Sequence, residues 1–462
     1  MKQLKIEYCT LTMADKSYRI EDLYGEDFYS YQDSMVGEYD THNIYSNELF
    51  IYFFQDYIAL KRFIQTEAID TIVIGKAADK KLLAYIIDIA KELDISISRN
   101  YWLYSSSVLL DYCKYISSCL YIACYQISIP QTRNIQAYKE KYAIIRTKAA
   151  ERISKVYRDV EILQEKKESD CCFWKCFSKH KRVLWSLKQL LNCRELDDIY
   201  KSVIKVAGKR TAQYCRSFYS IRVAQTRVYS KMLKEIAKHN HEVQFITSNN
   251  LDRFALCEEA IIHSVGGTII CVPHGLEYGF RVPHCFIGDV FFTTSRQSEK
   301  VLNRLYKTNK FIFDDDVCKR MFGVHVDNYS AQRTVFFTEP DELSTNYQII
   351  ESYLNSDTVN SEQLYLKLHP MDKKEHYSLY SGKIKFIDSF PDAICGNICV
   401  SRKSTALLEA LYNFSIPIAI IICAKDKSVF NTFASLNDKA IRQFYSCEDA
   451  WKKVEKIRNG EQ

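Results

Sequence analysis

Three short clusters of residues could carry out chemistry, and each follows an apolar run of the chain. His274 lies near the end of TIICVPHG at 268–275, and His369 near the end of LYLKLHP at 364–370. Ser401, Ser404 and Thr405 follow the apolar residues ICV at 398–400. Imidazole exchanges protons near neutral pH, and hydroxyls with the free N–H groups of a helix start bind phosphate. These clusters predict a nucleotide-sugar site at the ends of strands, where open α/β sheets bind ligands.

Neighbouring residues extend this predicted site, and each also has a structural interpretation. Strand alternation places Lys367 on the same side as His369, and a proline at 370 fixes the turn that follows. Basic residues would attract phosphate, and a carboxylate one turn into the next helix would accept ribose hydroxyls. The alternatives are a solvated lysine, ordinary N-caps at Ser401 or Ser404, and a salt bridge from the helix. The further candidates are Thr338, Glu339, Lys367, Pro370, Arg402, Lys403 and Glu409.

Acidic residues could act as the base or hold a metal. Glu277 and Asp252 are the carboxylates near His274 in the sequence, and the chain contains neither a Walker loop nor a glycine-rich dinucleotide fingerprint. The cluster at 314–316 in FIFDDD is a candidate for a divalent metal, but we interpret it as a solvated linker turn. Zinc is an alternative for Cys171, Cys172 and Cys176 with His180, although no second pair follows at ligand spacing. We expect no cofactor and no essential metal.

The alternation of strands and helices predicts an α/β fold with two doubly wound domains. Residues 69–98 follow a strand, helix and strand pattern. In the second domain we expect strands at 334–338, 364–368, 384–387, 397–400 and 416–422, and helices at 343–355, 404–413 and 447–458. The predicted organisation is an N-terminal α/β domain (1–130, completed by 241–300), a basic helical insertion (131–240), a linker (301–328), a nucleotide-binding domain (329–445) and a C-terminal helix (446–462).

Charge is unevenly distributed along the chain. Residues 131–240 contain 26 Lys+Arg and 11 Asp+Glu, a net +15, whereas the remainder of the chain carries −9. Such a segment suggests a polyanionic partner. Within it, 172–191 has the composition of an interfacial amphipathic helix, and the alternative is a helical hairpin docked on the body of the protein. The apolar run at 115–130 is too short to span a bilayer and fits a buried strand or helix better.

The N-terminus and the cysteines indicate a reducing compartment. The first residues, MKQLKIEYCTLTMADKSYR, contain no apolar stretch of the kind found in signal peptides. The 17 cysteines are scattered, which favours free thiols in the cytosol. We therefore expect a cytoplasmic protein that associates peripherally with the inner face of the cytoplasmic membrane.

The ordered motifs from about 243 to 422 resemble those of GT-B glycosyltransferases. The order is His-Gly at 274–275, Thr-Glu-Pro at 338–340, Lys-Leu-His-Pro at 367–370, and a Ser/Thr cluster before Leu-Glu-Ala at 408–410. More narrowly, the pattern is similar to bacterial sialyltransferases, polysialyltransferases, capsule Kdo-transferases and CDP-glycerol glycerophosphotransferases. The first 240 residues match no motif of these families.

This resemblance implies two Rossmann-like domains facing a cleft, a CMP- or CDP-linked donor and an inverting, metal-independent displacement. It implies that His369 binds the donor phosphate, that Ser404 and Thr405, with Ser401, match the phosphate-binding Ser-Ser pair, and that His274 is a base. The chain departs from the pattern in having Arg-Lys-Ser-Thr at 402–405. The acidic base motif of sialyltransferases is replaced by Gly-Glu-Asp in reverse order at 25–27.

The resulting hypothesis is a CMP-sugar transferase, of sialic acid or Kdo type, that acts in capsule or lipopolysaccharide synthesis. Its partners would be a nucleotide-sugar donor, a glycan or lipid-linked acceptor and an anionic membrane surface contacted by 131–240, without nucleic acid. The alternative enzymes are a CDP-polyol phosphotransferase and a UDP-sugar enzyme of the same fold. The alternative without enzymatic activity is a scaffold or polyanion-binding protein.

Overall fold

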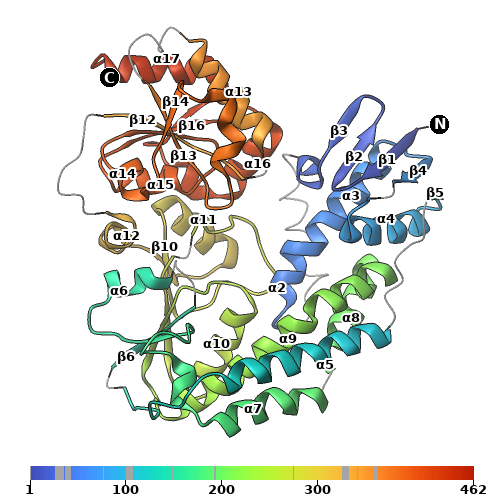
Figure 1. Cartoon of the computed structure of the whole chain (residues 1–462), viewed down its shortest axis with the longest axis vertical. Helices are drawn as coiled ribbons and strands as arrows, with labels where there is room; N and C mark the ends of the chain where they lie inside the picture. Colours follow the sequence, from blue (N-terminus) through green and yellow to red (C-terminus); the bar gives the residue numbers. More distant parts are fainter. Residues whose placement is uncertain are drawn as a thin grey trace. The chain divides into compact units, whose positions relative to one another are not determined.

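The structure is a computed structural model of the 462-residue chain, shown in Figure 1. It describes residues 2–25, 36, 43–75, 77–99, 108–138, 140–146, 150–191, 194–273, 275–324, 332–340, 342–356 and 363–461. The chain divides into two compact units. Unit 1 comprises residues 1–274 and 280–291, and unit 2 comprises residues 275–279 and 292–462.

Unit 1 begins with a small mixed sheet of its own. Its strand order is β3 (Lys16–Tyr18), β2 (Thr10–Met13), β1 (Gln3–Glu7), β4 (Thr71–Ile74) and β5 (Ser96–Arg99). The last three strands are parallel and the first three antiparallel. Helix α4 (Lys80–Glu92) starts at Asp79, whose carboxylate caps the N–H groups of residues 81 and 82. The strand, helix and strand predicted within 69–98 are confirmed.

A second, parallel sheet of unit 1 corrects the predicted organisation. Its six strands are β6 (Lys141–Ile145), β7 (Glu161–Gln164), β8 (Gln244–Thr247), β9 (Thr268–Cys271), β10 (Val290–Thr293) and β11 (Phe311–Phe313), in the order β7-β6-β8-β9-β10-β11. The pairings from β7 to β10 are parallel. The prediction that 131–240 is a helical insertion is therefore wrong in part, because β6 and β7 lie within it. Residues 1–130 and 241–274 both lie in unit 1, within which β1 to β5 form a sheet of their own.

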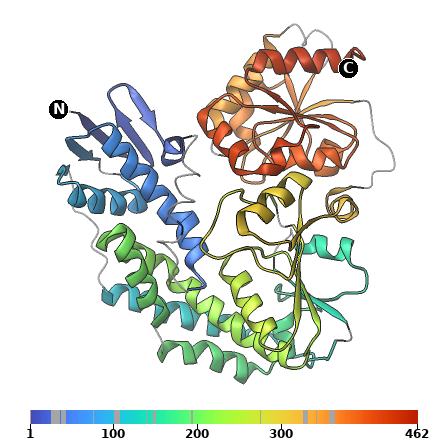
Figure 2. The same ribbon diagram turned by 180° about the vertical axis from the view of Figure 1, so that it is seen from behind.

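Long helices pack together in unit 1. They are α5 (Val108–Ile127), α7 (Lys179–Lys188), α8 (Arg194–Ala207) and α9 (Lys209–Lys238), and α5 packs against both α7 and α9, as the two views in Figures 1 and 2 show. Trp185 of α7 is buried, and Phe173 and Trp174 before it are also buried. The aromatic residues of 172–191 thus pack inward, as expected for a docked hairpin.

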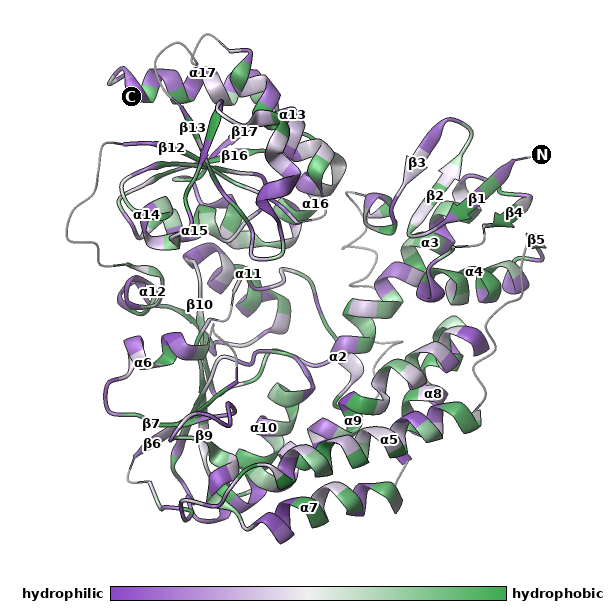
Figure 3. Cartoon of the chain, in the orientation of Figure 1, coloured by the Kyte–Doolittle hydropathy of each residue, from purple (hydrophilic) through white to green (hydrophobic). Residues whose placement is uncertain are grey.

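The outer face of α5 contradicts the expectation that this apolar run is buried. Leu109 is 72% exposed, Leu120 47% and Ile127 46%, and Figure 3 colours much of this helix as hydrophobic. The two charged residues of α5 do not extend from this outer face. Asp111 is buried, and the Lys114 amine donates a hydrogen bond to the Ser217 hydroxyl at 2.6 Å. The exposed residues of this face are Leu109, Leu110, Cys113, Ile116, Ser117, Leu120, Tyr121, Cys124 and Ile127. Within the described part of the chain, no helix combines the length and apolarity needed to cross a bilayer.

Unit 2 contains a six-stranded sheet in which every pairing is parallel. The order is β14 (Ile384–Phe386), β13 (Leu364–Lys367), β12 (Thr334–Phe337), β15 (Ile398–Ser401), β16 (Ile416–Ile420) and β17 (Arg442–Phe444). Numbered along the chain, this is 3-2-1-4-5-6, the doubly wound order whose direction reverses between the first and fourth strands. The reversal point of unit 2 is therefore between β12 and β15.

Helices cover both faces of this sheet, which explains its nearly continuous apolar strands. On one face, α13 (Leu343–Leu354) and α17 (Cys447–Arg458) pack Ile349 and Trp451 against Phe336 and Val400. On the other face, α14 (Phe390–Ile394) and α15 (Ala406–Leu411) pack against Val335. Helix α16 (Ala424–Thr432) follows β16. Figure 1 shows these layers within unit 2.

The predicted elements of unit 2 are largely confirmed, with two differences. The helix predicted at 404–413 is the six-residue α15, and the expected linker at 301–328 contains β11 (Phe311–Phe313) and α12 (Asp315–Phe322) after α11 (Arg296–Tyr306). Asp314 caps α12 by accepting the N–H groups of residues 316 and 317. The acidic cluster at 314–316 is therefore a helix start.

Candidate functional site

Three turns at the carboxyl edge of the unit 2 sheet carry most of the predicted site residues. Thr338 and Glu339 follow β12, His369 follows β13, and residues 402–405 follow β15. Because β12 lies between β13 and β15, the three turns are neighbours at one edge of one sheet. This edge includes the reversal point between β12 and β15, the position at which doubly wound sheets bind ligands. We call it the unit 2 crevice.

The His369 imidazole is held in a defined tautomer. The backbone N–H of Met371 donates to Nδ1 at 3.2 Å, so a neutral ring carries its proton on Nε2. The His369 N–H donates to the Thr338 hydroxyl at 3.1 Å, which ties the β13 turn to the β12 turn. His369 is partly exposed, so its Nε2–H is able to donate to a ligand. Pro370 next to it is exposed.

Asp372 anchors the β13 turn. Its carboxylate accepts from the Thr338 hydroxyl at 2.9 Å, from the Tyr377 hydroxyl at 2.6 Å and from the His376 ring at 2.8 Å. Burial opposes ionisation of this side chain, but the hydrogen bonds from Tyr377 and His376 outweigh it and lower the Asp372 pKa. Asp372 was not predicted, although its position three residues after a His-Pro turn is a signal for a turn-fixing carboxylate.

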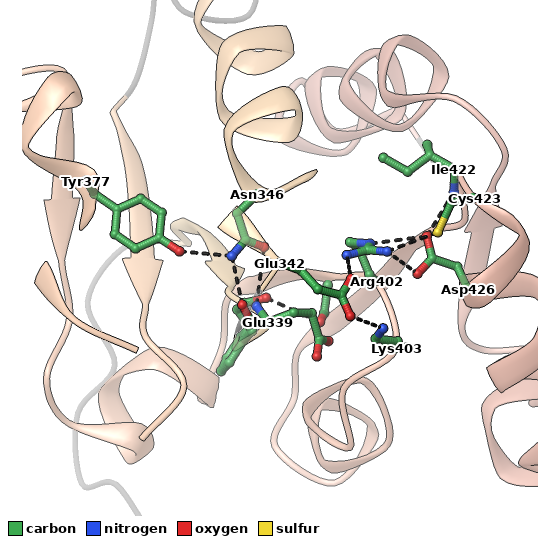
Figure 4. Close-up of polar contacts among 11 residues, drawn as sticks. Glu339, Glu342, Asn346, Tyr377, Arg402, Lys403, Ile422, Cys423 and Asp426 are labelled. Carbon is green, nitrogen blue, oxygen red and sulfur yellow. Dashed lines mark hydrogen bonds and ion pairs between the residues drawn. The ribbon is translucent and has the colours of Figure 1, made fainter. Parts of the chain in front are cut away.

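The basic residues after β15 are engaged in ion pairs (Figure 4). Arg402 is fully buried and donates Nη2 to Asp426 at 2.5 Å and Nη1 to Glu342. Lys403 donates to the other oxygen of Glu342 at 2.6 Å. Burial opposes the charge of Arg402, but the two carboxylates raise its pKa. Arg402 therefore holds the turns together and is inaccessible to a ligand.

The hydroxyl residues around α15 have different surroundings. Ser401 is fully buried and its hydroxyl contacts the carbonyl of Phe337 at 3.4 Å. The Ser404 hydroxyl accepts the N–H of Ala406 at 3.2 Å, and the Ser404 and Thr405 carbonyls accept the N–H groups of residues 407 to 409. The first N–H groups of α15 are thus satisfied internally, which removes the predicted phosphate cradle. Ser404 is partly exposed and Thr405 exposed, so their hydroxyls remain on the crevice, whereas Glu409 is buried.

Glu339 is the least satisfied group of the crevice. It is 9% exposed, and its Oε1 is buried without a hydrogen-bond donor among the described residues. Burial raises its pKa, against the opposing charges of Lys403 and Arg402. Asn346 fixes the backbone of Glu339 by accepting its N–H at 3.3 Å and donating to its carbonyl at 2.9 Å, as Figure 4 shows. A ligand hydroxyl or amide near Glu339 would supply the missing donor.

Lys367 differs from its predicted role. Its amine donates to the backbone carbonyl of Asp388 at 2.8 Å, which ties β13 to the turn after β14. Burial lowers the Lys367 pKa, while the nearby Asp388 charge opposes that effect. The Lys367 side chain therefore stabilises the β14 side of the sheet. Contrary to the prediction, it does not contribute its charge at the reversal point between β12 and β15.

The predicted base residues do not form a described site. His274 lies outside the described residues, as do the predicted motif residues 26 and 27. Glu277 belongs to unit 2 and is buried, where it accepts the N–H of Thr294 at 2.7 Å and the Thr294 hydroxyl at 2.6 Å. Burial raises the Glu277 pKa. Asp252 caps α10 (Arg253–His263) by accepting the N–H of Ala255.

Metal ligands are not grouped in the described part of the chain. No cluster of three or more His, Cys, Asp or Glu residues in it is arranged to hold a metal ion. Cys172 and Cys176 are buried, and the Cys172 thiol contacts the carbonyl of Glu165 at 3.7 Å.

A second crevice, in unit 1, was not predicted. The sheet that contains β6 to β11 has the order 2-1-3-4-5-6, whose reversal point lies between β6 and β8. Arg146 follows β6, and its Nε donates to Glu165, which follows β7, at 3.1 Å. The guanidinium carbon lies 3.3 Å from the ring centroid of Phe254. We call this the unit 1 crevice.

Glu258 of α10 lies fully buried behind this crevice. It accepts the Tyr229 hydroxyl at 2.6 Å, the Thr247 hydroxyl at 2.8 Å and the Asn249 amide at 2.8 Å. Burial raises the Glu258 pKa to about 7. The sequence contained a signal for it, since Glu258 falls on the same helical face as Phe254, Ile261 and Ile262.

Comparison with known proteins adds no identification. No family model matches the chain, and no curated protein matches it.

Proposed function

We propose that the chain transfers a sugar from a CMP-activated donor, of sialic acid or Kdo type, to a glycan acceptor. The observation that carries this proposal is the meeting of His369, Thr338, Glu339 and Ser404 at the reversal point of a 3-2-1-4-5-6 parallel sheet. Nucleotides bind at this position in doubly wound folds. The crevice offers one imidazole N–H, two accessible hydroxyls and one unsatisfied carboxylate oxygen, which match phosphate and ribose groups.

In the proposed step the acceptor hydroxyl attacks the anomeric carbon and the bond from that carbon to the CMP phosphate breaks. One displacement inverts the configuration. The His369 Nε2–H donates to the departing phosphate oxygen, and its fixed tautomer supports that role. The hydroxyl proton passes to a base. Glu277 is an unfavourable base because it is buried with its oxygens already accepting hydrogen bonds from Thr294. His274 stays the candidate for this role.

Charge balance favours a donor with a single phosphate. Both cations of the β15 turn are paired: Arg402 with Glu342 and Asp426, and Lys403 with Glu342. A CMP-sugar carries one phosphate charge, whereas the diphosphates of UDP- and CDP-linked donors carry two. A turn whose cations are already neutralised suits the smaller phosphate charge better, and the sugar carboxylate of a sialic acid or Kdo donor has to be balanced outside this turn.

Thermal stabilisation by CMP, CDP, UDP, GDP and ADP tests this proposal. We expect CMP to raise the melting temperature of the wild type and to do so less in His369→Ala. The matched control is His239→Ala, because His239 is exposed and its ring contacts the carbonyl of Glu235 on its own helix. A preference for CDP would favour a polyol phosphotransferase and a preference for UDP another sugar donor. No shift with any nucleotide would contradict the enzyme and favour a scaffold.

We further propose that the protein works at a membrane surface, with α5 as the contact. The exposed face of α5 carries Leu109, Ile116, Leu120 and Ile127 and no charged residue. Neighbouring α7 adds the exposed Leu184 and Leu187, with exposed lysines at 179 and 188. An apolar face beside basic residues is typical of helices that lie on anionic lipid.

Vesicle flotation tests the membrane contact. We expect binding to vesicles of phosphatidylcholine with phosphatidylglycerol, weaker binding to phosphatidylcholine alone, and loss of binding in Ile116→Glu/Leu120→Glu. The matched control is Tyr445→Glu, an exposed aromatic in unit 2. Equal recovery with and without vesicles would contradict the contact. Self-association that the α5 double variant abolishes would show instead that a second copy covers this face.

A further inference from the structure

A cavity of about 340 Å³ opens in unit 1 at the carboxyl ends of β6 and β7. Arg146 and Glu165, the first residues after these strands, lie in its wall, and α5, α9 and α10 close its other sides. Cavities of about 300–1,000 Å³ hold small ligands. The lining residues include Tyr121, Tyr125, Gln126, Trp174, Tyr229 and Phe254.

One buried polar group of this wall lacks a partner. Gln126 is 1% exposed, and its Oε1 has no hydrogen-bond donor among the described residues. A buried acceptor left without a donor costs about 1–3 kcal/mol. A residue that serves packing alone would be apolar here, so the amide indicates a ligand that donates a hydrogen bond.

The charges of the wall cancel. Arg146 is the cation and Glu165 the anion among the lining residues, and they pair at 3.1 Å. The guanidinium is also fixed over the rings of Phe254, at 3.3 Å, and Tyr229, at 4.9 Å. A phosphate or carboxylate would meet the negative charge of Glu165 as well as the positive charge of Arg146. The lining therefore favours a ligand without net charge.

Aromatic side chains form most of the remaining wall. Trp174 is 4% exposed and Tyr121 65% exposed, so the aromatic surface extends from the interior to the opening. Aromatic rings pack against the C–H faces of a saturated ring, while amide, carboxylate and guanidinium groups exchange hydrogen bonds with hydroxyls. We infer that the cavity binds a neutral sugar residue, with a ring hydroxyl donating to Gln126. The inference does not rest on the proposed function, because every group that it uses lies in unit 1.

Titration with glucose, galactose, N-acetylglucosamine and lactose tests this inference on the full chain. Saturation-transfer NMR and intrinsic tryptophan fluorescence both report binding, since Trp174 lies in the wall. We expect saturable binding of at least one of these sugars and about tenfold weaker binding in Gln126→Met, which corresponds to one lost hydrogen bond. We also expect Gln126→Met to be at least as stable as the wild type, because the unsatisfied oxygen is gone. A merely structural glutamine would show the opposite stability change.

Gln65→Met, at an exposed position of α3 (Gln55–Thr66), is the matched control and should leave binding unchanged. Absence of saturable binding with all four sugars overturns the inference, as does unchanged affinity in Gln126→Met. CMP and inorganic phosphate are the charged competitors. Displacement of a sugar by either would show a site for anions or nucleotides and would also overturn it. We expect Gln126→Met to leave the thermal stabilisation by nucleotides unchanged, so this test can fail independently of the proposal for unit 2.

Discussion

The unit 1 and unit 2 crevices occupy the same topological position, the reversal point of a parallel sheet, and yet their linings differ. In unit 2, cations and carboxylates from the turns neutralise one another, and His369, Ser404 and Thr405 stay accessible. In unit 1, aromatic rings surround one pair of opposite charges, Arg146 and Glu165. The backbone topology thus gives the position of each proposed ligand site, and the turn residues give the chemistry of the ligand proposed for it.

The same comparison separates two causes of a shifted pKa. Asp372 in unit 2 and Glu258 in unit 1 each accept several hydrogen bonds. At Asp372 these bonds outweigh burial and lower the pKa, whereas at the fully buried Glu258 desolvation wins and raises it. The hydrogen-bonded carboxylate of Asp372 is thereby kept ionised, and that of Glu258 is kept protonated towards neutral pH.

The largest expected effect is on catalysis and tests the unit 2 crevice. His369→Ala should lower kcat of sugar transfer by about 10²- to 10⁴-fold, the usual contribution of a general acid. His369→Asn keeps an N–H donor but supplies no proton, so it should preserve more donor affinity than activity. Initial rates with a CMP-sugar measure both parameters. Equal kcat and KM values for His369→Ala and wild type would contradict a catalytic role of the unit 2 crevice, and the two crevices would then not differ in this respect.

Arg402→Ala should destabilise the protein by about 3–5 kcal/mol, because it leaves the carboxylates of Asp426 and Glu342 without their buried partner. Urea unfolding at neutral pH measures this loss. Arg304→Ala, at an exposed position of α11, is the control and should change stability little. A loss of stability as small as that of the control would contradict the structural role of the Arg402 ion pairs, and Arg402 would then be available to a ligand.

Glu258→Gln should change the pH dependence of stability. A carboxyl whose pKa is raised on folding adds stability that is present below its unfolded pKa and is lost as pH rises through about 7. That change corresponds to roughly 3 kcal/mol. The charge of Asp252 also raises the Glu258 pKa, and the charge of Arg146 lowers it. We expect the wild type to lose stability between pH 5 and pH 8 and the variant to lose less. The same pH dependence of the free energy of unfolding in both proteins, measured by urea unfolding, would contradict a raised pKa of Glu258.

The smallest expected effect is that of Thr338→Val. The valine cannot donate to Asp372 or accept from the His369 N–H, so we expect a loss of about 1–2 kcal/mol at pH 7. A lowered carboxylate pKa contributes stability above the unfolded pKa, which is lost as pH falls through the folded pKa. The difference between variant and wild type should therefore shrink towards pH 3. A difference that is constant with pH would show that Thr338 does not act through Asp372.

The sequence was informative where the pattern is local. Strand β12 was predicted because burial on both faces makes it a continuous apolar run, and β13 because its apolar residues precede a His-Pro turn. Helix α17 was predicted at its observed bounds, and the structure shows Ser446 as its N-cap. The position of His369 at the carboxyl edge follows from the same patterns.

What could not be predicted depends on pairing between distant residues. Arg402 has the sequence signature of a phosphate ligand, but its partner Glu342 lies 60 residues away. Likewise, β6 pairs with β8 across about a hundred residues that are mostly helical, so its five residues alone gave no sign of a sheet. The unit 1 crevice was missed for this reason.

Residues 275–279 affect which fragment of the chain would contain all of unit 2. These residues belong to unit 2, although the chain returns to unit 1 for 280–291 before unit 2 continues. A fragment that starts at Phe292 would contain every strand of the 3-2-1-4-5-6 sheet and would lack Glu277. The buried Thr294 N–H would then lose its acceptor, and the Thr294 hydroxyl would keep only its contact with Ser435. Expression of unit 2 alone therefore needs the 275–279 pentapeptide, either fused in front of residue 292 or supplied as a separate chain.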